Sequence, residues 1–247
     1  MSVTDPVDPE ATFARRGQTV PFVDFYPSNR PWRMLLPPIY RYLPSRYVDQ
    51  FFSTGVLRLS SIATFRAHKD EARGDTEEGA SKVILRGSDR TFAATIYHSE
   101  AAYILCGSFI LSPSIMRAFD GCDSAIEITN VADFGLEIAR HLPGFQRGLS
   151  GYCIYSQGSL LMRDIPEKPF PLPSEEQLTE QVLREAAAKA AQEERFFLKA
   201  PKFAAQAEYR LIFAMDDPPS GPLVLHAPRA RDFCRKVGPA ELTFDPR

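Results

Sequence analysis

The sequence lacks any apolar run long enough to cross a membrane. Its longest apolar segments, such as 101–111, fall well short of the roughly 20 residues that a spanning helix requires. The first residues, MSVTDPVDPEATFARRG, contain acidic residues and prolines where a secretion signal has a basic start and an apolar stretch. We therefore expect a soluble, cytoplasmic protein with no membrane partner.

An excess of charge of one sign is also lacking. Lys and Arg together number 29 and Asp and Glu number 31, so the surface as a whole has no basic field that would attract nucleic acid. The four cysteines lie far apart in the sequence and form no CxxC pair. This spacing predicts free thiols in a reducing compartment.

Motifs for several common catalytic devices are missing. The four histidines are scattered and make no HxxxH or HExxH spacing, which predicts that the chain holds no metal. No GxSxG motif indicates a serine hydrolase, and neither a Walker loop nor GxGxxG is present to bind phosphates. Any catalytic site must therefore be built in another way.

The sequence does contain many short segments with the periodicity of strands and helices. Alternation and β-branched content predict strands, and helical spacing with Ser, Asn, Pro and Gly at the ends predicts helices. Segments 151–156 and 159–165, joined at Gln157 and Gly158, have the pattern of a hairpin. The predicted strands are 39–43, 56–60, 82–85, 91–97, 102–111, 124–129, 207–215 and 223–226, and the predicted helices are 45–54, 112–119, 130–141 and 174–198.

These elements predict an α+β fold with a mixed, mostly antiparallel split sheet flanked by helices. Residues 1–38 are rich in proline and lack periodicity, so we expect an extended arm, whose aromatic segment VPFVDFYP docks on the core. Residues 39–247 are expected to form a single α+β domain. The charged segment 62–81 is predicted to be a loop with one short helix.

Three positions are candidates for a binding or catalytic site. Arg41, in the middle of the first predicted strand, either points to solvent or binds an anionic group through its planar guanidinium. Ser108 lies in an apolar strand next to Gly107, which allows a ligand or another backbone to approach closely. Gln206 and Glu208 are expected to share one face of a strand, although Glu208 and Arg210 can also form an exposed ion pair.

The opening YRYLPSRYVDQFFSTGVLRLSS, the following FRAHKDEARGDTEEG and the later KAPKFAAQAEYRLIF resemble an uncharacterised bacterial family related to AbiGi-type abortive-infection proteins. The resemblance extends over about residues 39–215. Arg41, Ser108 and the QxE sequence at 206–208 also resemble the Arg, Ser, Glu pattern of ADP-ribosyltransferases, whose fold is a split antiparallel sheet with NAD across the cleft.

The second resemblance implies a role for each matching residue. Arg41, Tyr42 and Ser108 would bind NAD, with Arg41 on its phosphates and Ser108 at the nicotinamide pocket. Glu208 would be catalytic at the nicotinamide ribose, and Gln206 would orient the acceptor, a protein or nucleic acid. Loop residues Asp70, Glu71, Arg73, Asp75 and Glu78 would line the acceptor side, unless they form a solvated charge run.

The sequence therefore predicts an ADP-ribosyltransferase-like toxin or phage-defence effector, with an antitoxin as a possible further partner. Two alternatives remain open. A binding or sensor module of a defence system can retain the fold without turnover. Less favoured is a metal-dependent nuclease that uses carboxylates of the loop.

Overall fold

The structure is a computed structural model of the whole chain. It describes residues 22–25, 37–67, 74, 78–86, 91–97, 101–156, 160–164, 196–217, 219 and 221–242. The predicted helix 174–198 lies outside these residues except for its last three. These three form a short turn and the start of strand β11 (Leu198–Lys199).

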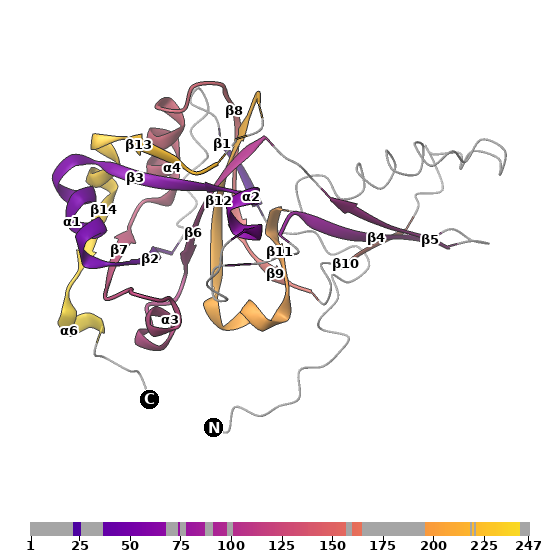
Figure 1. Ribbon diagram of the computed structural model, residues 1–247, viewed down its shortest axis with the longest axis horizontal. Helices are drawn as coiled ribbons and strands as arrows, with labels where there is room; N and C mark the ends of the chain where they lie inside the picture. The colour runs from indigo at the N-terminus through magenta and orange to yellow at the C-terminus, as the bar shows by residue number, and fades with distance from the viewer. Residues whose placement is uncertain are drawn as a thin grey trace. The chain divides into compact units, whose positions relative to one another are not determined.

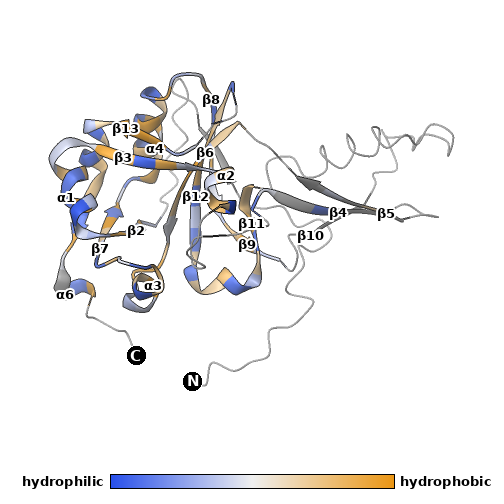
Figure 2. Ribbon diagram, viewed as in Figure 1, coloured by the Kyte–Doolittle hydropathy of each residue, from blue (hydrophilic) through white to orange (hydrophobic). Residues whose placement is uncertain are grey.

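The first predicted unit of strand, helix and strand is confirmed. It consists of β2 (Ile39–Leu43), α1 (Ser45–Thr54) and β3 (Val56–Ser61). Helix α1 buries Val48 and Phe51 and presents polar residues on its other side, and Figure 2 shows both kinds of residue along it. Gly55 ends the helix in the left-handed conformation, and its N–H donates to the carbonyl of Phe51.

Ser45, expected to cap α1, is instead its first residue, and the capping position is held by Pro44 without a side-chain hydrogen bond. The caps expected for two further helices are confirmed. Ser112 accepts a hydrogen bond from the backbone N–H of Ile115 and precedes α3 (Pro113–Ala118), which has proline at its first position. Asn130 accepts a bond from the backbone N–H of Asp133 at the start of α4 (Val131–Arg140). The short helix expected in the charged loop is α2 (Ile62–Arg66).

The chain divides into two compact units, each built from separated segments of the sequence. The larger contains Pro21–Glu78, Ser99–Cys153 and Ala205–Arg247, and the smaller contains the described residues of Gly79–His98 and Ile154–Ala204. Within the described residues, no helix has both the length and the hydrophobicity to cross a bilayer. The four cysteines all lie among the described residues, and none of them forms a disulfide bond.

The larger unit contains a nine-stranded sheet in which all strand pairs are antiparallel (Figure 1). Its main path runs through β1 (Phe22–Phe25), β8 (Phe145–Tyr152), β12 (Glu208–Met215), β6 (Ala102–Ser108), β2, β7 (Ser124–Ile128) and β14 (Cys234–Val237). Strand β1 comes from the segment predicted to be an arm, so at least that part of it joins the sheet.

The sheet divides at β6. At one end of β6, Ser108 pairs with Tyr40 of β2, and toward the other end Ile104 and Tyr103 pair with Ser60 and Ser61 of β3. Strand β3 then pairs with β13 (Leu223–His226). The structure therefore confirms the α+β class and a mostly antiparallel sheet.

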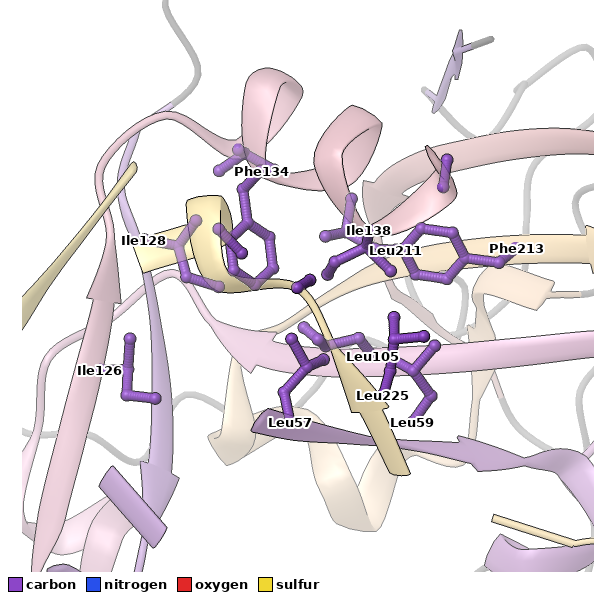
Figure 3. Close-up of a cluster of buried hydrophobic side chains, with 14 of the residues drawn as sticks. Leu57, Leu59, Leu105, Ile126, Ile128, Phe134, Ile138, Leu211, Phe213 and Leu225 are labelled. Carbon is purple, nitrogen blue, oxygen red and sulfur yellow. The ribbon is translucent and has the colours of Figure 1, made fainter. Parts of the chain in front are cut away.

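The main hydrophobic core covers one face of this sheet (Figure 3). It combines side chains of the strands with those of α1, α4 and the 3-10 helix η6 (Pro228–Phe233). The labelled members are Leu57, Leu59, Leu105, Ile126, Ile128, Phe134, Ile138, Leu211, Phe213 and Leu225. Because strand side chains alternate, the intervening residues point to the opposite face.

A smaller apolar cluster lies on this second face. Tyr42 and Ala125 contribute to it from the sheet, together with Ile115 of α3, Leu242 of α6 (Pro239–Leu242) and Val237. Tyr40 is partly buried and packs against this cluster.

The smaller unit contains two short sheets. Strands β4 (Ala80–Arg86), β5 (Thr91–Tyr97) and β10 (Leu160–Asp164) form one, and β9 (Ile154–Tyr155) and β11 form the other. The predicted hairpin of 151–156 and 159–165 is therefore wrong, because β9 pairs with β11 and β10 pairs with β4, both in parallel. Each strand finds a partner distant in sequence, which a local turn signal does not reveal.

We expect Gly55→Ala to destabilise the protein strongly. Gly55 has a φ of 77°, and a Cβ placed there would lie 2.3 Å from Cα of Pro228, a backbone atom that has no freedom to yield. The strain of the left-handed conformation and the clash together should lower the free energy of unfolding by at least about 3 kcal/mol, measured by urea denaturation.

Gly121→Ala is the matched control. Gly121 also has a positive φ, 68°, but a Cβ there would meet no atom within 4 Å. It should cost only about 1 kcal/mol, the conformational part of the effect. Equal losses in the two variants would show that the contact with Pro228 does not matter.

Candidate functional site

Ser108 and Glu208 lie directly opposite each other on neighbouring strands. Ser108 ends β6, Glu208 begins β12, and the two form a register pair. Ser108 also pairs with Tyr40 of β2, so three adjacent strands bring these residues into one row. Because directly opposed residues of antiparallel strands point to the same side, all three side chains belong to the second face.

Gly107 allows the strands to come this close. A Cβ at this position would lie 3.3 Å from the carbonyl oxygen of Tyr40 and 3.3 Å from Cδ1 of Ile39. Gly107 was expected to allow close approach of a ligand or of another backbone. In the structure the backbone of β2 approaches it closely. This approach occurs at the point where β2 joins β6.

Glu208 belongs to a buried group of three charged residues. Nε of Arg210 donates to Oε1 of Glu208 at 2.6 Å, and its Nη1 and Nη2 donate to the two oxygens of Glu78 at 2.7 and 2.9 Å. The side chains of Arg210, Glu78 and Glu208 are 1%, 3% and 5% exposed. The alternative that Glu208 and Arg210 form an exposed ion pair is therefore wrong, because both are buried.

The surroundings keep Arg210 charged despite its burial. Burial by itself disfavours the charged guanidinium, but interactions with Cys153, Glu208 and Glu78 outweigh it and raise the pKa of Arg210 well above its ordinary value. One positive charge thus faces two carboxylates in a site with little water. Losing Arg210 would leave two buried carboxylates without their counterion, whereas losing one carboxylate would still leave an ion pair.

Glu78 connects the charged loop to this site. It is the last acidic residue of the segment predicted as a loop, and its carbonyl accepts a 2.6 Å hydrogen bond from Nε of Arg66 at the end of α2. The interpretation of the loop as a solvated charge run is wrong for Glu78, which is buried. The other residues proposed for the acceptor side, Asp70, Glu71, Arg73 and Asp75, lie outside the described residues.

Arg41 does not join Ser108 and Glu208. It is the residue after Tyr40 in β2, so its side chain points to the face that carries the main core. There its Nη2 donates a 2.6 Å hydrogen bond to the carbonyl of Arg58 in β3. This bond links the two branches of the split sheet.

Tyr42 lies on the same face as Tyr40 but is buried. Its hydroxyl donates to the carbonyl of Ile110 and accepts from the N–H of Ser112, both at 2.7 Å, which fixes the loop that follows Ser108. Burial raises the pKa of Tyr42 to about 12, so the hydroxyl keeps its proton. Within the described contacts this tyrosine holds the loop in place.

Gln206 is not part of the strand that begins at Glu208. It ends the 3-10 helix η5 (Pro201–Gln206), and Ala207 has a φ of 46°, which interrupts the extended backbone. The expectation that Gln206 and Glu208 share a face through strand alternation is therefore wrong. The left-handed residue between them is alanine, so no glycine or asparagine in the sequence marks this turn.

Sequence reasoning missed the roles of Arg210 and Glu78. The Glu-x-Arg spacing at 208–210 indicated a pair, but only the folded structure shows that Glu78, 132 residues before Arg210, binds the same guanidinium. Among the described residues, no group of three or more His, Cys, Asp or Glu side chains is arranged to hold a metal ion.

Comparison of the chain with protein-family models, with curated proteins and with solved structures finds no match. The functional argument therefore rests on the residues of the site.

We expect Arg210→Met to destabilise the protein by about 3–5 kcal/mol, because it leaves two buried carboxylates without their counterion. Urea denaturation at neutral pH measures the loss. Adding Glu78→Gln and Glu208→Gln to Arg210→Met should recover part of it, since the uncompensated charges are then gone.

Arg235→Met is the control for losing an ion-paired arginine at the surface. Arg235 is 48% exposed and contacts Glu127 and Glu241. Its replacement should cost less than about 1 kcal/mol. A cost for Arg210→Met as small as this would contradict the importance assigned to the buried group.

Proposed function

We propose that this protein is an ADP-ribosyltransferase-like toxin or phage-defence effector, which transfers ADP-ribose from NAD to a macromolecule in the cytosol. The observation that carries the proposal is the direct pairing of Ser108 with Glu208 where the split sheet branches. A serine on a central strand and a glutamate at the start of its neighbour are the positions that the resemblance to these transferases requires.

The chemistry of the reaction suits a carboxylate at this position. When the bond between nicotinamide and ribose C1′ breaks, nicotinamide leaves with the bonding electron pair and positive charge develops on the ribose. A fixed negative charge stabilises such a transition state. An acceptor nucleophile then bonds to C1′ and loses its proton.

The buried ion pair supports this role for Glu208. Arg210 binds Oε1 of Glu208, which balances the negative charge and restricts the orientation of the carboxylate. Preorganised charge of this kind stabilises a transition state without the cost of reorienting groups during the reaction. Ser108, whose Oγ accepts a hydrogen bond from the N–H of Ile110, would border the nicotinamide pocket.

A second candidate function is a binding or sensor module without turnover. The observation that favours it is the burial of Glu208, whose pairing with Arg210 also serves the fold alone. Under this alternative the Glu78, Arg210 and Glu208 group is purely structural, and the protein recognises its partner through another surface.

Nicotinamide release from NAD tests the proposal. With cell lysate as a source of acceptors, we expect release by the wild type and a loss of at least about 100-fold in Glu208→Gln, because the charge opposite the developing cation is gone. Labelled NAD would identify the modified acceptor.

Glu78→Gln is the matched control, because it also removes one carboxylate from Arg210 but lies on no strand next to Ser108. It should reduce release far less, by under about tenfold, when equal amounts of folded protein are compared. Equal losses in both variants would indicate a structural role for Glu208. No release and no thermal shift with NAD for the wild type would favour the binding module.

A further inference from the structure

The row that contains Ser108 and Glu208 extends across five neighbouring strands. Glu208 of β12 pairs with Ser108 of β6, Ser108 with Tyr40 of β2, Tyr40 with Glu127 of β7, and Glu127 with Arg235 of β14. Every residue of this row carries a polar group. The next row on the same face, with Tyr42, Ala125 and Val237, is apolar and is packed in the smaller cluster.

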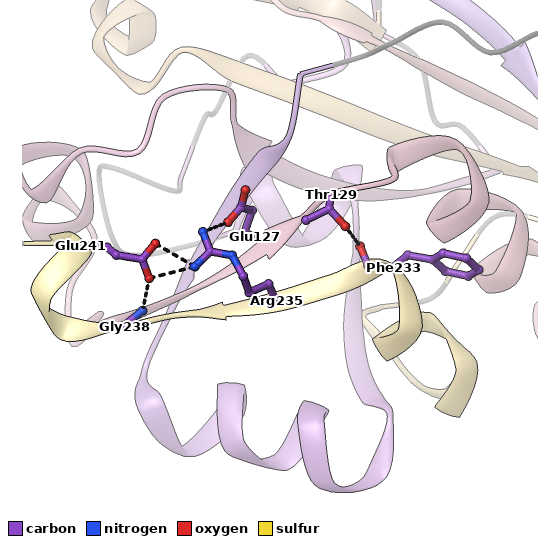
Figure 4. A network of polar contacts seen from close by, with 6 residues as sticks. All are labelled: Glu127, Thr129, Phe233, Arg235, Gly238 and Glu241. Carbon is purple, nitrogen blue, oxygen red and sulfur yellow. Dashed lines mark hydrogen bonds and ion pairs between the residues drawn. The ribbon is translucent and has the colours of Figure 1, made fainter.

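Most polar groups in the row already have partners. Glu208 binds Arg210. Figure 4 shows the guanidinium of Arg235, which binds Glu127 and Glu241. Ser108 accepts a hydrogen bond from Ile110. Hydrogen bonds and ion pairs therefore hold these side chains on either side of Tyr40, and Ser108, Glu208 and Glu127 are buried there.

Tyr40 differs from its neighbours in the row. It is partly exposed, and its hydroxyl has no hydrogen-bond partner among the residues that the structure describes. Buried tyrosines elsewhere in the unit behave differently, since the hydroxyl of Tyr209 donates to Ser150 and that of Tyr42 binds the loop after Ser108. A tyrosine at the centre of a polar row offers both an aromatic ring and a hydrogen-bonding group.

We propose that Tyr40, and not Arg41, is the residue of β2 that contacts the dinucleotide, donating a hydrogen bond from its hydroxyl to an oxygen of NAD. The inference rests on the proposed function. Tyr40 lies two strands from Glu208, and neighbouring strands are about 4.8 Å apart, so its backbone is about 10 Å from that of Glu208 across the sheet. This separation suits contacts to two parts of one extended ligand.

The electrostatic surroundings are consistent with a donor role. Burial raises the pKa of Tyr40, Glu127 raises it further, and Arg235 opposes this shift. The phenol therefore keeps its proton at neutral pH and remains a hydrogen-bond donor.

Arg41 is a poor candidate for the same contact because of its position in the strand. It alternates with Tyr40, points to the opposite face and donates to the carbonyl of Arg58. Reaching the row of Ser108 and Glu208 would require β2 to shift by one residue. That shift would expose Ile39, which is fully buried in the main core.

Three variants of neighbouring residues test this assignment, with the Michaelis constant for NAD in nicotinamide release and the free energy of unfolding as readouts. Tyr40→Phe should raise KM about tenfold, which corresponds to one hydrogen bond of about 1.4 kcal/mol, and change kcat by less than about twofold. Tyr40→Ala should raise KM further. Arg41→Ala should leave KM within about twofold while it lowers stability.

The outcomes separate the assignment from the proposed function. Release with an increased KM in Arg41→Ala and an unchanged KM in Tyr40→Phe would overturn the role of Tyr40 and leave the transferase intact. If the wild type neither releases nicotinamide nor shows a thermal shift with NAD, the proposed function fails and the assignment of Tyr40 fails with it. A KM increase confined to the Tyr40 variants, with unfolding of Tyr40→Phe unchanged, supports both.

Discussion

The buried guanidinium of Arg210 joins parts of the chain that are 132 residues apart in sequence. It binds Glu78 at the end of the charged loop and Glu208 at the start of β12. The three charged side chains have almost no contact with water, so removing Arg210 would leave two uncompensated negative charges in the interior. The arrangement of the sheet at the Ser108 end of β6 therefore depends on Arg210.

The same group determines what Glu208 is able to do. A charged carboxylate that is buried without a partner is strongly destabilising, whereas one bound to a guanidinium has its charge balanced. Arg210 supplies that partner from two residues further along the same strand, on the same face. The structural and the functional interpretation of Glu208 both rest on its contact with Arg210. Because Glu78 binds the same arginine, comparing variants of Glu78 and Glu208 distinguishes the two interpretations.

Local patterns in the sequence predicted the elements well and their partners less well. Alternation identified β2 and β5 with their exact bounds, and residues such as Ser112, Asn130 and Gly55 marked helix ends through their own hydrogen bonds or dihedral angles. Strand β8 was predicted only from residue 151, since 145–150 contain glycine and serine among polar residues. The hairpin failed because β9 and β10 pair with distant strands, and strand pairing over such separations leaves no local signal.

For the candidate site, the sequence pattern did not reveal which face of the sheet each side chain occupies. The sequence placed Arg41, Ser108 and Glu208 on suitable strands, but strand membership does not determine the face to which a side chain points. That depends on register, which is fixed by the packing of Ile39 in the core and by the approach of β2 to Gly107. Given this register, Tyr40 occupies the row of Ser108 and Glu208, and Arg41 links β2 to β3. The residue of β2 in this row is therefore a tyrosine and not an arginine. A ligand bound to the row would meet a hydrogen-bond donor at the position of β2 rather than a positive charge.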